Sequence, residues 1–316
     1  MARKALIVGV NYYEFINPLN GCVSDAYNVK SVLEKHGDGT KNFDIKICVA
    51  MDEDSKLTRM DLKESIKQLF KDDDEVALFY FSGHGHIENT GGYILTSECT
   101  TGDDGLPMND ILKIVNDSKA INKIVILDTC HSGKMGNFGE SATALINQGV
   151  TILSASQQDE YSMDEGDGST FTKLFVDALD GSAANLIGEI TPGSVYAHID
   201  QSLGAWEQRP VFKTNVKSFV SLRKVPPSIS MEDLKKITEL FDESFEHNLN
   251  PSYEPDSEEH DQKNMDKFKI LQKYNRVNLV VPVGAEHMYY AAMESKKCKL
   301  TVLGEFYWNL VKKGQI

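Results

Sequence analysis

One histidine and one cysteine stand directly after apolar runs in this sequence. The run that ends at Phe81 is followed by SGHGH, which contains His84, and the run that ends at Leu127 is followed by DTCHSG, which contains Cys130. A thiol with an ordinary pKa of about 8.5 is mostly protonated at neutral pH, so it needs a neighbouring base to become a nucleophile. An imidazole takes that proton and later delivers it to a leaving amine. The pair predicts thiol-based nucleophilic catalysis if the fold brings His84 and Cys130 together.

The elements that would position the pair are short buried strands alternating with helices. The strand runs are short, apolar and mostly rich in β-branched residues, and the helical patterns lie between them. This alternation predicts an α/β fold with a mainly parallel sheet and helices on both faces, so that chemical groups gather at the carboxyl ends of the strands. The expected strands are Lys4–Val10, Asp44–Val49, Val76–Phe81, Lys123–Leu127 and Val150–Leu153, and the expected helices are Ser24–Lys35, Thr58–Phe70 and Met108–Val115.

The rest of the chain predicts a larger first domain and a smaller second one. Two prolines after residue 225 and the chain length place a boundary near 224, giving domains 1–224 and 225–316. The first should end with helices and a last strand, and the second should contain a helix, a polar loop or linker, an apolar run and a terminal strand and helix. These are Phe171–Leu179, Ser194–Leu203 and Ser218–Leu222, then Met231–Glu246, Asn250–Asp261, Val277–Val283 and KKCKLTVLGEFYWNLVKKG.

Composition excludes several function classes. A net charge of −14 disfavours binding to nucleic acid or to an anionic membrane, because phosphate contacts need clustered lysine and arginine. The five cysteines are widely spaced without a CxxC motif, which favours reduced thiols over a disulfide framework. No apolar run approaches the roughly 20 residues that span a bilayer, and the first apolar run is too short for a signal peptide. A cytoplasmic protein is expected.

The motifs resemble those of a known family. SGHG and DTCHSG resemble the two catalytic motifs of the caspase and metacaspase peptidases, and the resemblance extends to LIVGVNYY, LNGCVSDA, SASQQDEYSMDE and RPVFKTNV. It covers about residues 1–224 and is nearer to the bacterial, metacaspase-like branch than to animal caspases. The resemblance implies a caspase-like fold and a cysteine endopeptidase with Cys130 as nucleophile and His84 as general base and acid. It also implies that the backbone N–H groups of Gly85 and Cys130 hold the oxyanion.

The resemblance also bears on specificity. Asp25 and Asp128 match the positions where metacaspases carry the acids of the first specificity pocket, and Asp159 is a further candidate. Carboxylates beside a cleft favour protein substrates with arginine or lysine at P1, arginine the more because of its bidentate geometry. For Asp25 a second interpretation stays open, namely that it caps the helix beginning near Ser24.

Processing and metal binding are less clearly indicated. Lys134 is the single basic residue between Gly133 and Gly149, where caspases carry a cleavable linker, so it is the candidate for autoprocessing. Many metacaspases need Ca²⁺, but the acids expected after the histidine motif are only loosely matched by Asp103 and Asp104, and calcium is not predicted. No spacing matches a zinc site, so no metal and no cofactor are expected.

The second domain has no recognised family and is expected to be a sensor that holds the peptidase inactive. Bacterial caspase-like proteins commonly act in antiphage defence or cell death, sometimes gated by a nucleotide messenger. Side chains suited to such a messenger are available, although packing explains most of them equally well: Arg276, His287, Tyr289, Tyr290 and Trp308. Two alternatives remain, a non-catalytic signalling module with a caspase fold and a thiol-dependent metal or redox protein.

Overall fold

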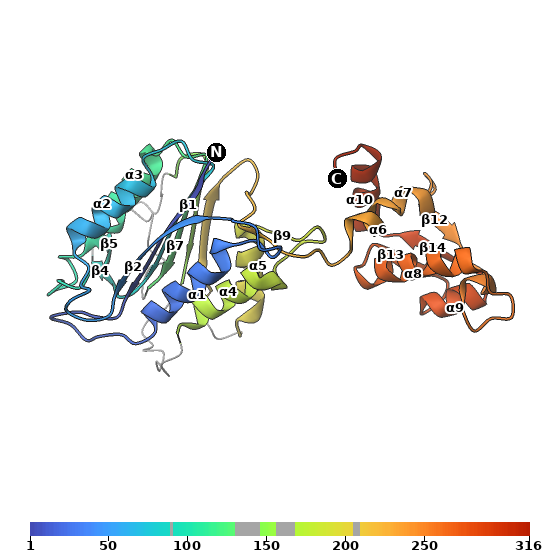
Figure 1. Cartoon of the computed structure of the whole chain (residues 1–316), viewed down its shortest axis with the longest axis horizontal. Coiled ribbons are helices and arrows are strands. Elements are labelled where there is room, and N and C mark those ends of the chain that lie inside the picture. Colours follow the sequence, from blue (N-terminus) through green and yellow to red (C-terminus); the bar gives the residue numbers. More distant parts are fainter. Residues whose placement is uncertain (89–90, 130–145, 156–167, 205–208) are drawn as a thin grey trace. The chain divides into compact units, whose positions relative to one another are not determined.

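The computed structural model describes residues 1–88, 91–129, 146–155, 168–204 and 209–316. The chain forms two compact units, one of residues 1–184 and 189–225 and the other of residues 185–188 and 226–316. Figure 1 shows the elements of both units in the colours of the sequence. Each unit has a hydrophobic interior of its own.

A mainly parallel sheet forms the centre of the first unit. Over the described residues it has six strands in the order β10-β8-β7-β3-β1-β2. Neighbouring strands run parallel except β10, which pairs antiparallel with β8. The strands are β1 (Arg3–Val10), β2 (Asp44–Ala50), β3 (Val76–Ser82), β7 (Asn122–Asp128), β8 (Val150–Ser154) and β10 (Val211–Asn215).

Both faces of the sheet are buried. In β1, Leu6 and Val8 belong to the core on one face, whereas Ala5 and Ile7 belong to the core on the other. Helices α2 and α3 cover the first face, and α1, α4 and α5 cover the second (Figure 1). This confirms the predicted α/β class. The helices are α1 (Cys22–Glu34), α2 (Arg59–Leu69), α3 (Met108–Asp117), α4 (Thr170–Asp177) and α5 (Pro192–Ser202).

The strand predicted at Ser218–Leu222 is wrong, because the strand at the β8 edge of the sheet is β10. An edge strand has one neighbour and tolerates polar residues. Because Lys213–Asn215 are polar, β10 does not form a continuous apolar run in the sequence. Val220 and Leu222 instead pack into the core from irregular backbone. The smaller elements of the unit are β4 (Gly85–Glu88), β5 (Gly91–Ile94) and β6 (Leu106–Pro107), the pair β9 (Glu189–Ile190) and β11 (Arg223–Lys224), and the turn η2 (Ala178–Ser182) after α4.

The second unit is a small α+β structure. Its described strands form an antiparallel sheet in the order β12-β14-β13, and its core includes the fully buried Tyr274 and Phe241. The predicted terminal strand and helix are confirmed as β14 and α10. The elements are α6 (Met231–Lys235), α7 (Ile237–Leu240), β12 (Glu246–Asn248), η3 (Pro251–Tyr253), α8 (Gln262–Arg276), β13 (Val280–Val283), α9 (Met288–Met293), β14 (Lys297–Leu300) and α10 (Val302–Lys312).

The prediction of one long helix in this unit is wrong. The expected helix Met231–Glu246 consists of the two short helices α6 and α7. Helical structure ends at Leu240, because Asp242 accepts the backbone N–H of Ser244 at 2.8 Å in a turn and Phe245 has a positive φ of 58°. The expectation of a loop or linker at Asn250–Asp261 is confirmed as a loop, and this loop belongs to the second unit. It contains the buried Tyr253, and Asp261 caps the N-terminus of α8.

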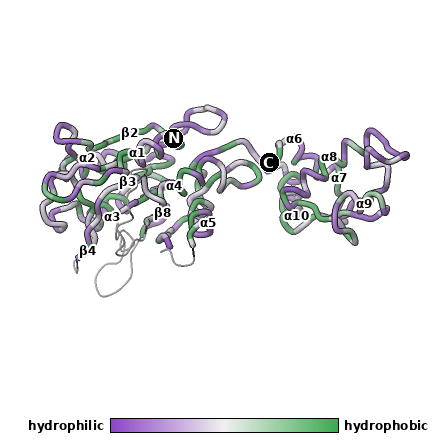
Figure 2. Tube along the Cα trace, turned by 90° about the horizontal axis from the view of Figure 1, so that it is seen from below, coloured by the Kyte–Doolittle hydropathy of each residue, from purple (hydrophilic) through white to green (hydrophobic). Residues whose placement is uncertain are grey.

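The hydropathy of the chain varies over short distances. In Figure 2 hydrophobic and hydrophilic residues alternate along the trace of both units. Among the described residues no helix is long and apolar enough to cross a membrane.

Candidate active site

The histidine and cysteine motifs follow neighbouring strands. Ser82 at the end of β3 and Asp128 at the end of β7 are register partners, so the segments that follow them start side by side. The backbone N–H of Gly83 also donates to the backbone oxygen of Asp128 at 3.3 Å. Cys130 lies two positions beyond Asp128 and is outside the described residues.

Tyr13 fixes the backbone of His84. Its hydroxyl accepts the His84 N–H at 2.8 Å, and its ring centroid lies 4.7 Å from that of the imidazole. The close approach of the Tyr13 hydroxyl to this backbone requires glycine at position 83, since a Cβ there would lie only 2.8 Å from the tyrosine oxygen. On the far side of the histidine, its carbonyl accepts the N–H of Leu95 at 2.9 Å. These contacts leave the His84 backbone one orientation.

The imidazole of His84 is held in the tautomer that a general base needs. Its Nε2 lies 2.8 Å from the backbone oxygen of Asn17, and because a carbonyl only accepts, Nε2 carries the proton. The lone pair of a neutral ring is then on Nδ1. Burial lowers the pKa of His84, against a smaller upward effect of the Asn17 hydrogen bond. The neutral, proton-accepting form is therefore favoured at neutral pH.

Gly85 opens β4 and pairs with Ile94 of β5. The first residue of the small sheet is thus directly attached to the histidine. The expected role of its N–H in holding an oxyanion stays a prediction.

The two acids expected in the specificity pocket converge on one residue of α4. Asp25 accepts the backbone N–H of Ser169 at 3.2 and 3.3 Å and the Ser82 hydroxyl at 3.2 Å. Asp128 accepts the Ser169 hydroxyl and, at 2.6 Å, the hydroxyl of Thr172. Asp25 is 2% exposed and Asp128 is 9% exposed. Two buried carboxylates therefore lie on either side of Ser169.

This arrangement creates a negative environment inside the first unit. Burial raises the pKa of Asp128, and the hydroxyls of Ser169 and Thr172 act in the opposite direction. Burial also raises the pKa of Tyr80 well above its usual value, with smaller contributions in the same direction from the charges of Asp128 and Asp25. Such a site suits a positively charged group.

Ser82, Ser169 and Thr172 were missed from the sequence as partners of the acids. Ser169 carried a usable signal, because it immediately precedes a helical pattern and caps α4. The alternative role of Asp25 as a cap of the helix near Ser24 is not seen. The N-cap of α1 is Gly21, and the carboxylate bonds to Ser82 and Ser169 instead.

Of the remaining candidates in the first unit, Asp103 and Asp104 form hydrogen bonds within their own loop. Lys134 and Asp159 lie outside the described residues. Asp104 accepts the N–H of Thr100 at 2.6 Å and closes its own loop, and Asp103 accepts the hydroxyl of Thr101 at 2.5 Å. Within the described part of the chain no group of three or more potential metal ligands is found.

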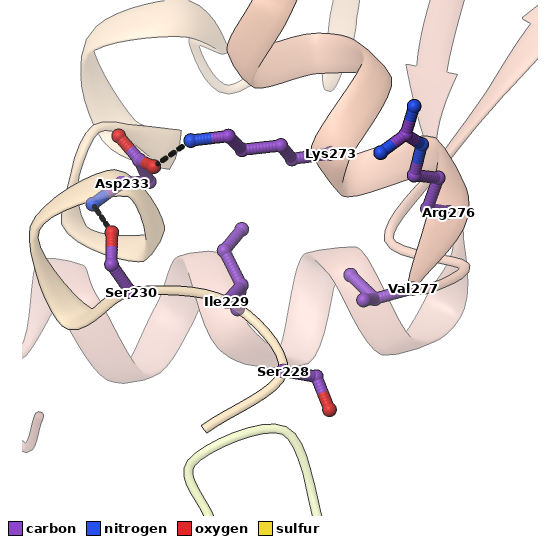
Figure 3. Close-up of a pocket in the computed structure, with 7 residues that line it drawn as sticks. All are labelled: Ser228, Ile229, Ser230, Asp233, Lys273, Arg276 and Val277. Carbon is purple, nitrogen blue, oxygen red and sulfur yellow. Dashed lines mark hydrogen bonds and ion pairs between the residues drawn. The ribbon is translucent and has the colours of Figure 1, made fainter. Parts of the chain in front are cut away.

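Arg276 lines a cavity of about 290 Å³ in the second unit. Figure 3 shows the cavity between the end of α8 and the segment that leads into α6. Lys273 crosses it to Asp233, with Nζ 2.6 Å from the carboxylate. The lining residues are Ser228, Ile229, Ser230, Asp233, Lys273, Arg276 and Val277.

The other candidates of the second unit are elsewhere. Trp308 is a core residue whose indole N–H donates to the backbone oxygen of Phe241 at 2.8 Å. Tyr289 and Tyr290 are about half exposed at α9, where the ring of His287 stacks on Tyr290 with 6.1 Å between centroids. The five candidates therefore do not form one site.

Fold and site together define an α/β protein with a histidine motif and buried acids at the carboxyl edge of a parallel sheet. The caspase domain model matches residues 2–225. The chain therefore belongs to the caspase domain family.

Individual relatives agree with this assignment. Metacaspase-1 of Plasmodium falciparum is 30% identical over 148 residues, covering 42% of this chain and 24% of that protein. Metacaspase-6 of Arabidopsis thaliana is 29% identical over 189 residues, covering 55% and 46%. The chain thus spans less than half the length of these relatives. Caspase-1 from Spodoptera frugiperda is similar in fold, with a TM-score of 0.52 at 13% identity, covering 71% of this chain and 91% of that structure.

Proposed function

We propose that the protein is a cysteine endopeptidase that uses Cys130 and His84 and cleaves after arginine or lysine. The observation that carries the proposal is the pair of buried carboxylates, Asp25 and Asp128, next to the segment that holds His84. The caspase family membership supports the peptidase class, and the acids support the substrate preference.

Hydrolysis of a peptide bond by Cys130 and His84 needs no cofactor. His84 takes the proton of the Cys130 thiol, and the sulfur forms a bond to the scissile carbonyl carbon. The C–N bond then breaks while His84 returns the proton to the amine, which leaves a thioester. Water, deprotonated by the same imidazole, hydrolyses the thioester to a carboxylic acid and restores the thiol. The Nε2–H tautomer of His84 supports this role, because it leaves Nδ1 able to accept a proton.

The preference for basic P1 residues rests on charge. A guanidinium or ammonium placed beside Asp25 and Asp128 would offset two negative charges that burial has separated from water. An aspartate at P1 would instead add a third. Arginine is expected to bind better than lysine, since its planar donors match two carboxylates at once.

Signal gating by the second unit is the less direct part of the proposal. The unit would hold the peptidase inactive until a small anionic messenger such as a nucleotide binds, in keeping with an effector of antiphage defence or cell death. The cavity supports this, because the cationic Arg276 and the hydroxyls of two serines line it beside the Lys273–Asp233 ion pair. The competing function is a non-catalytic module that uses the fold for binding.

Covalent labelling tests the proposal. A peptidyl arginine chloromethyl ketone, added with and without Ca²⁺ and cyclic nucleotides, is expected to alkylate Cys130, as read by mass spectrometry of the peptides. Cys130→Ala should remove the label, His84→Ala should slow it, and an aspartyl ketone should label poorly. Equal labelling of Cys22, Cys48 or Cys298 in the wild type and in Cys130→Ala would refute Cys130 as the nucleophile. No labelling under any condition would favour the non-catalytic binding module.

A further inference from the structure

The N-terminus of α4 is built around the carboxylates of Asp25 and Asp128. Ser169 is the N-cap of this helix, and its oxygen accepts the N–H of Thr172 at 3.0 Å. Its own N–H reaches Asp25, and its hydroxyl proton goes to Asp128. A hydroxyl has one proton and two lone pairs, so one side chain both caps the helix and binds an acid.

The residue before the cap is shaped for the same purpose. Gly168 has a φ of +84°, and a Cβ on it would collide with the Asp25 carboxylate. Glycine therefore allows the chain to pass directly over the acid and present the Ser169 N–H to it.

A chain of hydroxyls supports the second acid. Thr172 lies 2.6 Å from Asp128 and 2.5 Å from the hydroxyl of Tyr80. Because an ionised carboxylate only accepts, the threonine proton points to Asp128, and Tyr80 donates to Thr172. Asp128 thus accepts hydrogen bonds from the hydroxyls of Ser169 and Thr172, and these two bonds fix the orientation of its carboxylate.

We infer that Ser169 is a positioning residue for substrate recognition, which holds Asp25 and Asp128 as a single receptor for the cationic side chain at P1. This rests on the proposed function. Two like charges in a buried site repel each other, and the donors of Ser169, together with the positive end of the α4 dipole, offset that repulsion. Neither carboxylate then has to turn away or gain a proton before substrate arrives.

The groups around Asp128 give the inference a pH signature. Facing this region are Asp25 and Cys22 from α1 and Tyr80 from β3. Burial already raises the pKa of Asp128, and the Ser169 hydroxyl counteracts that rise. Without the hydroxyl the carboxylate would be protonated at higher pH, and the protonated acid would no longer attract a cation.

The test is steady-state cleavage of a peptide with arginine at P1 by the full chain. Ser169→Ala is expected to raise KM about tenfold with little change in kcat, because a hydrogen bond to a charged group is lost. The rise in KM at low pH should begin at a higher pH than in the wild type. Ser169→Thr, which keeps the hydroxyl, should restore the wild-type KM and the wild-type pH at which KM begins to rise.

The matched control is Thr191→Ala, which removes the N-cap of α5 in the same unit without touching either acid. If Ser169→Ala and Thr191→Ala have equal effects on KM at equal thermal stability, Ser169 is only a helix cap and the inference fails. Wild-type cleavage after arginine with unchanged KM in Ser169→Ala also overturns it. Absence of any Cys130-dependent cleavage after arginine or lysine overturns the proposed function itself, and the inference with it.

Discussion

The hydroxyl of Tyr13 accepts the backbone N–H of His84 at 2.8 Å, while the two rings lie 4.7 Å apart at an interplanar angle of 55°. One residue from the loop after β1 thus holds both the main chain and the ring of the proposed general base.

Tyr13→Phe is therefore expected to lower kcat about tenfold with little effect on KM. The ring contact and the Asn17 hydrogen bond would remain, but the His84 N–H would lose its acceptor, so the main chain that carries the imidazole would be held less firmly. Steady-state kinetics of an arginyl peptide measures this. Tyr12→Phe is the matched control, and an unchanged kcat in Tyr13→Phe would show that the contact is dispensable.

The pH dependence should reflect the lowered pKa of His84. The neutral imidazole is the active base, so a pKa below the ordinary value of about 6.5 keeps the enzyme active at lower pH than a free histidine would. Activity should fall only as the pH drops through that lowered pKa. The titration of the His84 ring, followed by NMR in Cys130→Ala, checks the assignment. A midpoint above 6.5 would contradict the burial argument.

Arg276→Ala should abolish binding of an anionic messenger to the second unit. In the wild type, pyrophosphate or a cyclic nucleotide that occupies the cavity is expected to raise the melting temperature, because it stabilises the folded form. Lys269→Ala, on the same helix but outside the cavity lining, should behave like the wild type. Equal shifts in wild type and Arg276→Ala would exclude the cavity as the site.

Trp308→Ala should destabilise the second unit by about 3–5 kcal/mol, the usual cost of truncating a buried aromatic residue. The indole N–H bond to Phe241 and the edge contact with Phe245 would be lost as well. Tyr289→Ala, at an exposed ring, should stay within about 0.5 kcal/mol. Calorimetric unfolding of the full chain measures both. A stable Trp308→Ala protein would argue for a ligand role instead.

The central strands could be predicted from sequence because they are buried on both faces and read as continuous apolar runs. β3, for example, extends one residue beyond its predicted end at Phe81. The edge strand β10 could not be found in this way, since half of its environment is solvent and Lys213 and Thr214 interrupt the pattern. The long-range hydrogen bonds of the acids were also out of reach, because nothing local links the backbone N–H of Ser169 to Asp25, which is 144 positions away.

In the candidate site, too, residues within local motifs could be predicted, whereas residues that depend on long-range packing could not. His84 and the acids stood in motifs at strand ends or helix starts, so their types and positions indicated a role. Tyr13 binds the His84 N–H beside Gly83, and Ser82 binds Asp25. Both contacts depend on how β1 and β3 lie next to each other. Side chains in the second unit gave no such guidance, because Trp308 and Tyr289 differ in burial rather than in any local pattern.

The most direct test of the account is a panel of fluorogenic peptides with arginine, lysine, aspartate or leucine at P1. The wild type is compared with Cys130→Ala, Asp25→Asn, Asp128→Asn and, as a control, the exposed-acid variant Asp103→Asn, each with and without Ca²⁺ and cyclic nucleotides. We predict Cys130-dependent cleavage after arginine and lysine, with kcat/KM falling about a hundredfold in the Asp25 and Asp128 variants and unchanged in the control. Cleavage after aspartate, or full arginine activity in both variants, would contradict the account.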